Sequence, residues 1–438
     1  MALGGGTFVT QNKILPGTYI NFISAANASA TLSDRGIAAM ALELDWGVEG
    51  SVFEITGGDF QTNSLTLLGY DYSSDKLKGL RDLFRNVKTL YAYRLNGGGT
   101  KASNTFASAK YSGVRGNDIT IVIATNIDDD TKSDVKTYVD TVLVDSQTVA
   151  TSGKTTALAD NDWVDWVDNV ALENTAGTKL TGGTNGSVTN ASHQTFLEKI
   201  ESYSFNALGV VTTTAAVNAL YVAFCKRLRD DMGVKFQAVV YNTAADYEGC
   251  VNVKNAVTDA GESNASLVYW VTGVIAGTAV NKSVTNKVYD GEFTVNTDYT
   301  QSQLETALQS GEFVLHKVGS DVRVLEDINS LVTTSDTKGE AFKDNQTIRV
   351  IDQVANDFAV VFNTKYLGTV PNDAAGRISL WSDFVAIFTQ LQDIRAIQDF
   401  TDEDVTVEEG ATRKAVVANS AITPVGTMTK LYMQCEIR

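Results

Sequence analysis

Apolar and polar residues alternate along the last residues of the chain, from Lys430 onward. A period of two is typical of a β-strand with one buried and one exposed face. The apolar face of this predicted strand consists of Leu431, Met433, Cys435 and Ile437. Chain ends are usually frayed and polar unless another element holds them. The pattern therefore predicts that this end joins a sheet, either in its own molecule or in another one.

The first 25 residues predict a second arm rather than a packed domain. Glycines at positions 4–6 and a proline at position 16 leave this stretch little to bury, while Ile20 and Phe22 lie among polar neighbours. Residues 26–99 follow as the first part of a folded body, where we expect short strands and one helix. That helix begins at Ser73 or Ser74, and a buried strand covers Thr89–Leu95.

Residues 100–186 have a different pattern, with short β-rich runs separated by polar turns. This pattern predicts a small β-sandwich. Both of its ends fall at glycine clusters, near Gly99 and Gly182, as expected for a domain inserted into a host fold. Residues 101–186 contain 7 Lys and Arg against 12 Asp and Glu, a net charge of −5, so we expect this module to be exposed to solvent.

Residues 187–338 alternate helical patterns with near-continuous apolar strands, which predicts an α/β core with parallel pairing. The run from Tyr269 to Val284 predicts a helix whose small residues permit close packing. Residues 339–422 predict two long helices and a strand, and 423–438 form the C-terminal strand arm. The predicted fold class is α+β multidomain, with a central α/β core, an inserted β-sandwich and extended strand arms at both ends.

Composition and charge narrow the functional classes. The chain has 438 residues and a formal net charge of −17, without a basic run. Nucleic-acid binding depends on Lys and Arg that neutralise phosphates, so neither nucleic acid nor an anionic membrane is an expected partner. The acidity favours solubility at high concentration, with a basic partner surface as the alternative. No apolar run is long enough for a membrane span, and the first residues do not resemble a secretory signal.

Candidate chemistry is sparse, and we expect no catalytic residues, no cofactor and no metal. The two histidines, His193 and His316, are more than 120 residues apart, and the three cysteines form no CxxC pair. The acidic run Asn126–Asp134 lacks the glycine and glutamate spacing of a calcium loop, so a solvated turn is expected. Trp163 and Trp166 are spaced as on one helical face. They predict part of the module's core, with an exposed contact patch as the alternative.

Several stretches resemble one known family in the same order along the chain. They are "LPGTYINFIS", "LTGGTNG", "NKSVTNKVYDGEF", "YLGTVPNDAAGRISL", "FVAIFTQLQDIRAIQDF" and the ending "RKAVVANSAITPVGTMTKLYMQCEIR". These stretches are similar to the sheath proteins of contractile phage tails. The similarity is greatest to sheaths of phages, defective prophages and tail-like bacteriocins (diffocin-type particles) of Gram-positive bacteria. It spans nearly the whole chain and is least distinctive in the inserted module.

The resemblance implies a structural subunit rather than an enzyme. Sheaths of this family polymerise helically around an inner tube as stacked rings, hexameric in expectation, and contract to drive the tube through a target envelope. Expected partners are other copies of the chain, the inner tube protein, and the baseplate and tail terminator proteins. The expected location is a phage tail or tail-like particle assembled in the cytoplasm of the bacterial host.

The resemblance also implies roles for particular residues. Both arms would leave their own subunit and complete a sheet on neighbours. The expected contact residues are Tyr19, Ile20, Phe22 and Ile23 on the N-terminal arm and Leu431, Met433, Cys435 and Ile437 on the C-terminal arm. Residues 339–422 would be the inner, tube-facing domain. The candidate tube-facing helix spans about 382–398, with Phe384, Gln390, Gln392, Asp393 and Arg395. The module at 100–186 would face outward.

Two other functions remain open at this point. A surface-layer or adhesin-type structural protein would account for the β-rich module, although no secretory signal is expected. An enzyme built on the α/β region is the least favoured reading, because no polar cluster with catalytic spacing is found.

Overall fold

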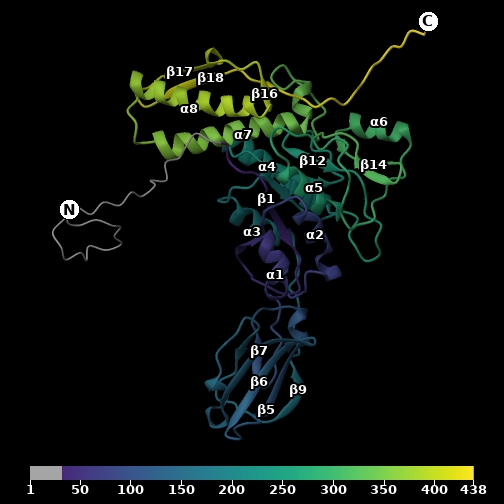
Figure 1. Ribbon diagram of the computed structural model, residues 1–438, viewed down its shortest axis with the longest axis vertical. Coiled ribbons are helices and arrows are strands. Elements are labelled where there is room, and N and C mark those ends of the chain that lie inside the picture. The colour runs from purple at the N-terminus through teal and green to yellow at the C-terminus, as the bar shows by residue number, and fades with distance from the viewer. Residues whose placement is uncertain (1–31, 438) are drawn as a thin grey trace, which may run out of the picture. The chain divides into compact units, whose positions relative to one another are not determined.

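The computed structural model describes residues 32–437 (Figure 1). The chain divides into two compact units. Within the described residues, the core unit comprises 34–353 and 424–437, and the C-terminal unit comprises 32–33 together with 354–423. Each unit is described by itself below.

A seven-stranded sheet forms the centre of the core unit, in the order β13-β12-β11-β10-β1-β3-β2. Its strands are β1 (Ile37–Leu42), β2 (Val52–Thr56), β3 (Thr89–Arg94), β10 (Ala207–Gly209), β11 (Gln237–Tyr241), β12 (Cys250–Val253) and β13 (Glu312–Phe313). Neighbouring strands are parallel, except that β2 is antiparallel to β3. The parallel pairing predicted for the α/β core is confirmed, and the sheet extends into residues 34–95.

Helices cover both faces of this sheet (Figure 1). They are α1 (Gly57–Leu68), α2 (Lys78–Phe84), α3 (Asn190–Ile200), α4 (Ala215–Lys226) and α5 (Leu267–Gly277), and α4 continues into a π-helical turn (Arg227–Asp231). Successive strand residues point to opposite faces. Met40 of β1 therefore packs in one core with α1, α2 and α5, while Ala39 packs in the other core with α3 and α4.

Two local predictions can be compared directly with these helices. A β-carbon at Gly273 of α5 would lie 2.6 Å from the carbonyl oxygen of Leu83, so the glycine permits the close helix packing that the small residues predicted. The expectation of one helix in residues 26–95 is wrong, because α1 precedes α2. Thr56 caps the N-terminus of α1, and Gly69, with a φ of 81°, ends it in the left-handed conformation.

The rest of the core unit is one short helix, one hairpin and the first half of a long helix. These elements are α6 (Gln301–Gln309), β14 (Leu315–Val318), β15 (Asp321–Val324) and α7 (Asn345–Val361). Residues of α7 up to Gln353 are grouped with the core unit, and residues from Val354 are grouped with the C-terminal unit.

The inserted module is a four-stranded antiparallel sheet, β7-β6-β5-β9, with a second sheet of β4 and β8. Its strands are β4 (Ala107–Ala109), β5 (Ile119–Thr125), β6 (Lys132–Val139), β7 (Val142–Ala150), β8 (Val164–Trp166) and β9 (Thr175–Lys179). The helical spacing assigned to Trp163 and Trp166 is wrong, since Trp166 ends the strand β8. The expectation that Trp163 belongs to the core is confirmed, because it is 3% exposed.

The module and the body share part of their interior. Trp46, from the loop after β1, is fully buried in the apolar cluster of the module. Its ring stacks on Trp163 with centroids 4.9 Å apart and meets Tyr111 edge to face. At the neck, Thr100 and Thr184 form a β-bridge, and the Gly186 amide donates to the Asn96 carbonyl at 2.9 Å. The two ends of the insertion therefore lie side by side.

The C-terminal unit contains the rest of α7, a second long helix and short strands. A π-helical turn (Phe362–Tyr366) follows α7, and the remaining elements are α8 (Ala374–Asp393), β16 (Ile397–Gln398), β17 (Val405–Glu409), β18 (Val416–Ser420) and β19 (Thr423–Pro424). Phe358 of α7 stacks on Phe384 of α8 with centroids 3.9 Å apart. The two predicted long helices and the strand after them are thus present.

Candidate functional site

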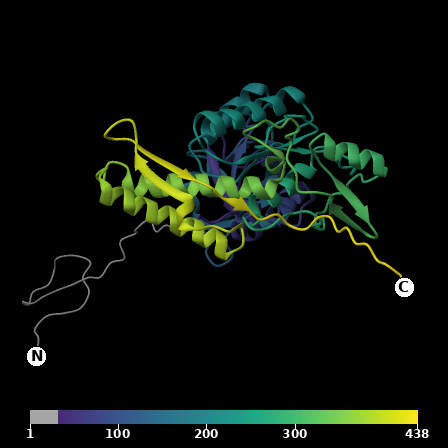
Figure 2. The same cartoon turned by 90° about the horizontal axis from the view of Figure 1, so that it is seen from above.

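The C-terminal segment leaves its apolar side chains uncovered in the single subunit. Residues 426–437 form neither helix nor strand and appear as a yellow coil in Figures 1 and 2. Exposed fractions are 87% for Leu431, 77% for Met433 and 96% for Ile437, and Cys435 is an exposed free thiol. The predicted strand therefore has no sheet partner in its own subunit within the described residues.

The base of this segment is attached to the core unit. The side-chain amide of Gln346, at the start of α7, donates to the Val425 carbonyl at 2.9 Å. Farther along, Lys430 lines a hollow of about 510 Å³ together with Glu305, Glu326 and Glu340. The segment is thus attached at its base through a backbone carbonyl, and its lysine lines a hollow that also contains carboxylates.

A hairpin in the C-terminal unit has strand edges to which no other strand of residues 32–437 is paired. β17 and β18 pair antiparallel from Val405 with Ser420 to Glu409 with Val416, and they form a sheet of two strands (Figure 2). The Trp381 side chain of α8 donates to the Val405 carbonyl at 2.9 Å and fixes one end of the hairpin. An isolated two-stranded hairpin is only marginally stable, and open edges are where further strands add.

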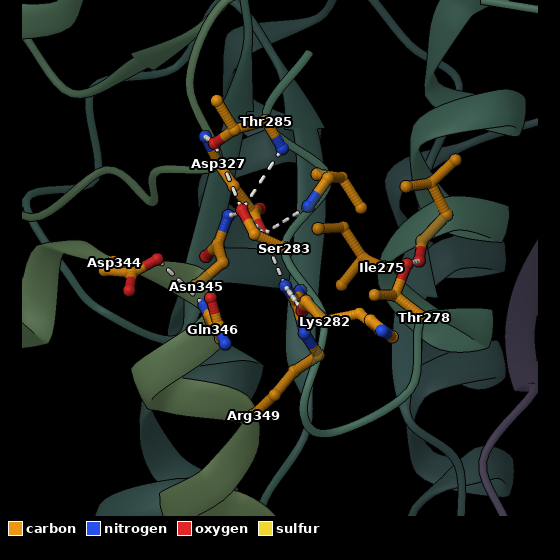
Figure 3. A network of polar contacts seen from close by, with 12 residues as sticks. Ile275, Thr278, Lys282, Ser283, Thr285, Asp327, Asp344, Asn345, Gln346 and Arg349 are labelled. Carbon is orange, nitrogen blue, oxygen red and sulfur yellow. Dashed lines mark hydrogen bonds and ion pairs between the residues drawn. The ribbon is translucent and has the colours of Figure 1, made fainter. Parts of the chain in front are cut away.

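A buried polar network holds the first half of α7 to the core unit (Figure 3). Arg349 and Asp327, each about 1% exposed, form an ion pair, and Arg349 also donates to the Lys282 carbonyl at 2.9 Å. Asp327 accepts further bonds from the side chain of Asn345 and the backbone amide of Val284, both at 3.0 Å. Nearby, burial raises the pKa of Asp344 above its usual value. The start of α7 is therefore fixed in position.

A second buried ion pair holds the same half of α7. Arg229, in the turn after α4, donates to both carboxylate oxygens of Asp352 at 2.6 and 2.8 Å. Burial alone would lower the pKa of Arg229, but the charge of Asp352 and its hydrogen bonds raise it above the usual value. Removing one partner of such a pair leaves an uncompensated buried charge, which typically costs about 3–5 kcal/mol.

The residues predicted on the tube-facing helix take different positions. Phe384 is buried against Phe358. Gln390 is partly buried, and Gln392 accepts from the Phe400 amide at 2.7 Å. The exposed members of the set are Asp393, the last residue of α8, and Arg395, which lies two residues beyond it. The predicted extension of this helix to residue 398 is wrong, because Ile397–Gln398 is the strand β16. The tube-facing role stays a prediction and depends on these two residues. On the N-terminal arm, the predicted contacts Tyr19, Ile20, Phe22 and Ile23 lie outside the described residues.

Both histidines and two of the three cysteines lie on helices or strands of the core unit. His193 is buried in α3, where its Nδ1 lies 3.0 Å from the Tyr221 hydroxyl, and burial lowers its pKa. Burial also lowers the pKa of His316, on β14. Cys225 and Cys250 are buried free thiols. Within residues 32–437, no group of three His, Cys, Asp or Glu side chains is placed to hold a metal ion.

A surface hollow of the C-terminal unit lacks a side chain suited to act as a general base. One hollow of about 590 Å³ in the C-terminal unit is lined by Tyr366, Arg377, Arg413 and Lys414 among apolar residues. It contains cations and a phenol, but its lining has no histidine, cysteine or carboxylate that could act as a base. None of the helices in the described part of the chain is long and apolar enough to cross a membrane.

Comparison with known proteins accounts for this arrangement. Four family models match consecutive parts of the chain. They are the Gp18 domain III N-terminal region of the tail sheath protein (residues 35–95), the phage tail sheath β-sandwich domain (96–185), the phage tail sheath central domain (186–330) and the phage tail sheath C-terminal domain (337–438). The Bacillus subtilis phage-like element PBSX protein XkdK is 33% identical, over 99% of this chain and 100% of that protein.

The chain belongs to the phage tail sheath family. The tail sheath protein of Clostridium phage phiCD119 is 29% identical over 48% of this chain and 59% of the phage protein. Among solved structures, the Desulfitobacterium hafniense sheath tail protein superposes with a TM-score of 0.82 at 39% identity, covering 95% of this chain and 99% of that chain. The contracted helical sheath of the anti-feeding prophage has a TM-score of 0.56 at 12% identity, over 97% of this chain and 99% of that chain, and shows a shared fold.

These comparisons confirm the resemblance found in the sequence. The chain is a structural sheath protein of phage and prophage tails, with the expected α+β architecture and β-sandwich module. Sequence reasoning missed the buried ion pairs of this sheath protein. Their signal was present, because Arg349 and Asp352 lie three residues apart, on one side of a helix whose neighbouring residues Ile348 and Val350 are apolar. A charge on the apolar stripe of a helix indicates a buried partner elsewhere in the chain.

Proposed function

We propose that this sheath protein polymerises head to tail into a helix around an inner tube, with subunits linked by strands that leave one copy and join a sheet on another. The observation that carries the proposal is the uncovered apolar face of residues 431–437. The open edges of the β17–β18 hairpin provide a matching acceptor.

Strand addition gives this contact its stability. Fully burying a large aliphatic side chain is worth about 1.5–3 kcal/mol, so Leu431, Met433 and Ile437 together supply several kilocalories per contact. Each backbone hydrogen bond made to the open edge adds a net contribution of about 0.5–1.5 kcal/mol. These gains offset the entropy lost when an extended segment becomes ordered on a neighbour.

The location of donor and acceptor favours a polymer over a closed pair. The donor segment and the acceptor hairpin are different surfaces of the chain, so a contact between two copies leaves one of each unused. A heterologous contact of this kind repeats without limit unless its rotation closes a ring. Stacked rings, hexameric in our proposal, and a helical sheath both follow from such repetition.

We extend the proposal to contraction. The sheath assembles in an extended, metastable state, then shortens and widens and drives the tube through a target envelope. Energy stored in the assembly supplies this work, and the arms keep subunits linked while the bodies rotate. The inner tube protein, the baseplate and the tail terminator are the proposed partners, and assembly takes place in the host cytoplasm. Asp393 and Arg395 are the exposed candidates for the tube contact.

Electron microscopy of purified protein tests the polymer directly. Full-length protein is compared with a version that ends at Gly426, and a chain carrying Lys430→Ala serves as a control that keeps the apolar face. We expect striated tubes from the full-length and control proteins and single subunits from the truncated one. Tubes of equal length from the truncated protein would show that the last strand is not the link.

The outward position of the module has its own test. Residues 101–181 are replaced by a short Gly-Ser linker, and Trp46→Ser is added because deletion would otherwise expose an indole that is now fully buried. We expect this variant to form tubes of smaller diameter. Failure to assemble, in a variant whose thermal unfolding remains cooperative, would place the module in the subunit contacts and contradict the proposal.

A further inference from the structure

Leu32 and Ser33, the first residues that the structure describes and here called the root of the N-terminal arm, are bound by the C-terminal unit. The Leu32 amide donates to Oε1 of Gln390, on α8, at 3.3 Å. The Ser33 amide donates to Oδ1 of Asp357, on α7, at 3.2 Å, and the Ser33 hydroxyl donates to the same oxygen. Two helices of one unit thus hold two consecutive residues at the base of the arm.

Because Asp357 is buried, its carboxylate depends on the hydrogen bonds that Ser33 donates. The residue is only 2% exposed. A buried carboxylate is costly unless it accepts hydrogen bonds, and bonds to a charged acceptor are stronger than those between neutral groups. The backbone and side chain of Ser33 both supply donors to it. The carboxylate therefore stabilises a defined path for the chain at residue 33.

The following residues are bound just as firmly within the core unit. The Arg35 guanidinium donates to the carbonyls of Ile275 and Thr278, each at 3.0 Å, at the C-terminal end of α5, where a cation is favoured. The amides of Gly36 and Ile37 both donate to Oδ1 of Asn206 at 3.0 Å. Between the two sets of bonds lies one residue, Asp34, whose side chain is 95% exposed.

We propose that Asp357 and Gln390 are positioning residues that fix the root of the N-terminal arm to the C-terminal unit. This inference rests on the proposed function, in which a neighbouring subunit binds the arm. A load on the arm is then carried first by α7 and α8, through the bonds of Leu32 and Ser33, before it reaches the bonds of Arg35 in the core unit. The arm root also keeps a fixed direction while a neighbour captures the arm.

Hydrogen exchange on the full-length protein tests the anchor without any need for assembly. In Asp357→Ala, we expect the peptide containing Leu32 and Ser33 to exchange at least about tenfold faster than in wild type. Asp357→Asn retains an acceptor oxygen and should restore most of the protection. Asp383→Ala is the matched control, because Asp383 accepts from Tyr366 and Lys365 in the same unit and does not contact the root. Equal exchange in wild type and Asp357→Ala, or equal acceleration in Asp383→Ala, would overturn the anchor.

Assembly then tests what the anchor does. With thermal unfolding within a few degrees of wild type, we expect Asp357→Ala to give fewer and shorter tubes by electron microscopy and Asp357→Asn to give normal ones. Normal tubes from Asp357→Ala with a released root would overturn the positioning role. If wild type itself gives no tubes, the proposed function fails, and the exchange experiment still decides whether the root is anchored.

Discussion

Strand β6 of the module and the C-terminal segment share one sequence pattern and differ in what covers it. In β6, which lies between β5 and β7 in its sheet, the alternate residues Ser133, Val135, Thr137 and Val139 are buried. Along residues 431–437 the same alternation leaves each apolar side chain exposed. Periodicity therefore predicts a strand with two distinct faces, and the rest of the chain decides whether one of these faces is covered. A face left uncovered in a folded subunit indicates a partner outside it.

The largest expected effect is the difference in unfolding free energy when a charge is placed in β6 and when it is placed in the C-terminal segment. Val135→Asp in β6 places a carboxylate at a site that is 1% exposed, so we expect a loss of about 4 kcal/mol or more in the free energy of unfolding of the module. Chemical denaturation followed by tryptophan fluorescence measures it, since Trp163 lies in the same core. A similar loss in Met433→Asp would contradict the comparison, because that side chain is already exposed in the single subunit.

The next effect concerns a side chain that the body supplies to the module. Trp46→Ala removes a fully buried indole from the module's core, and we expect a loss of about 3 kcal/mol. Scanning calorimetry measures the loss, with Trp381→Phe as a control for removal of a partly exposed indole. If Trp46→Ala is no worse than the control, the module's core does not depend on the body.

Much of the fold could be predicted from the sequence, because the apolar periodicity of many elements agreed with the turn and cap residues at their ends. Helices α3, α4, α7 and α8 and strands β3 and β11 combine clear apolar periodicity with turn or cap residues at their ends. The exceptions have physical causes. α1 is polar and begins with two glycines, so its capping by Thr56 and its packing outweigh weak helix propensity. Trp163 and Trp166 lie three residues apart, but pairing of β8 with β4 decides their conformation.

The candidate site was predictable only in part. The alternation of apolar and polar residues from Leu431 to Ile437 could be recognised, because it is visible in the local sequence alone. Gln390 was selected as a surface residue, yet it bonds to Leu32 some 358 positions earlier, which no local pattern contains. Phe384 was likewise predicted on the tube-facing surface of its helix, but it is buried against Phe358 of α7.

A smaller expected effect is the pH dependence of stability that arises from the buried side chain of His193. Burial lowers the pKa of His193 in the folded chain below the usual value of 6.5, so the unfolded chain binds the proton first as the pH falls. We expect His193 to lower the stability below about pH 6.5 by at most about 1.4 kcal/mol per pH unit, and its contribution to level off below the folded pKa. Denaturation curves from pH 7.5 to 5.0 measure the slope. An unchanged slope in His193→Gln would assign it to other groups.

The smallest expected effect on stability is also the sharpest test of the exposed segment. Met433→Lys should change the free energy of unfolding of the single subunit by no more than about 0.5 kcal/mol, because the side chain has no cover to lose. The same change should abolish tube formation, since it places a charge in the neighbour's sheet. Thermal unfolding and electron microscopy on one preparation give both results. If Met433→Lys lowers the stability of the single subunit and also abolishes tube formation, the segment folds against its own subunit.

The shared interior at Trp46 limits how modules can be exchanged between sheath proteins. An insertion whose two ends meet at a narrow neck looks transferable as a cassette, with residues 96–185 as its boundaries. Trp46 lies outside those boundaries and yet belongs to the module's core. A chimera built from the cassette alone would therefore carry a cavity or a clash at this position. Recombination that preserves stability must move the loop around residue 46 together with the insertion, so the unit of inheritance is discontinuous in sequence.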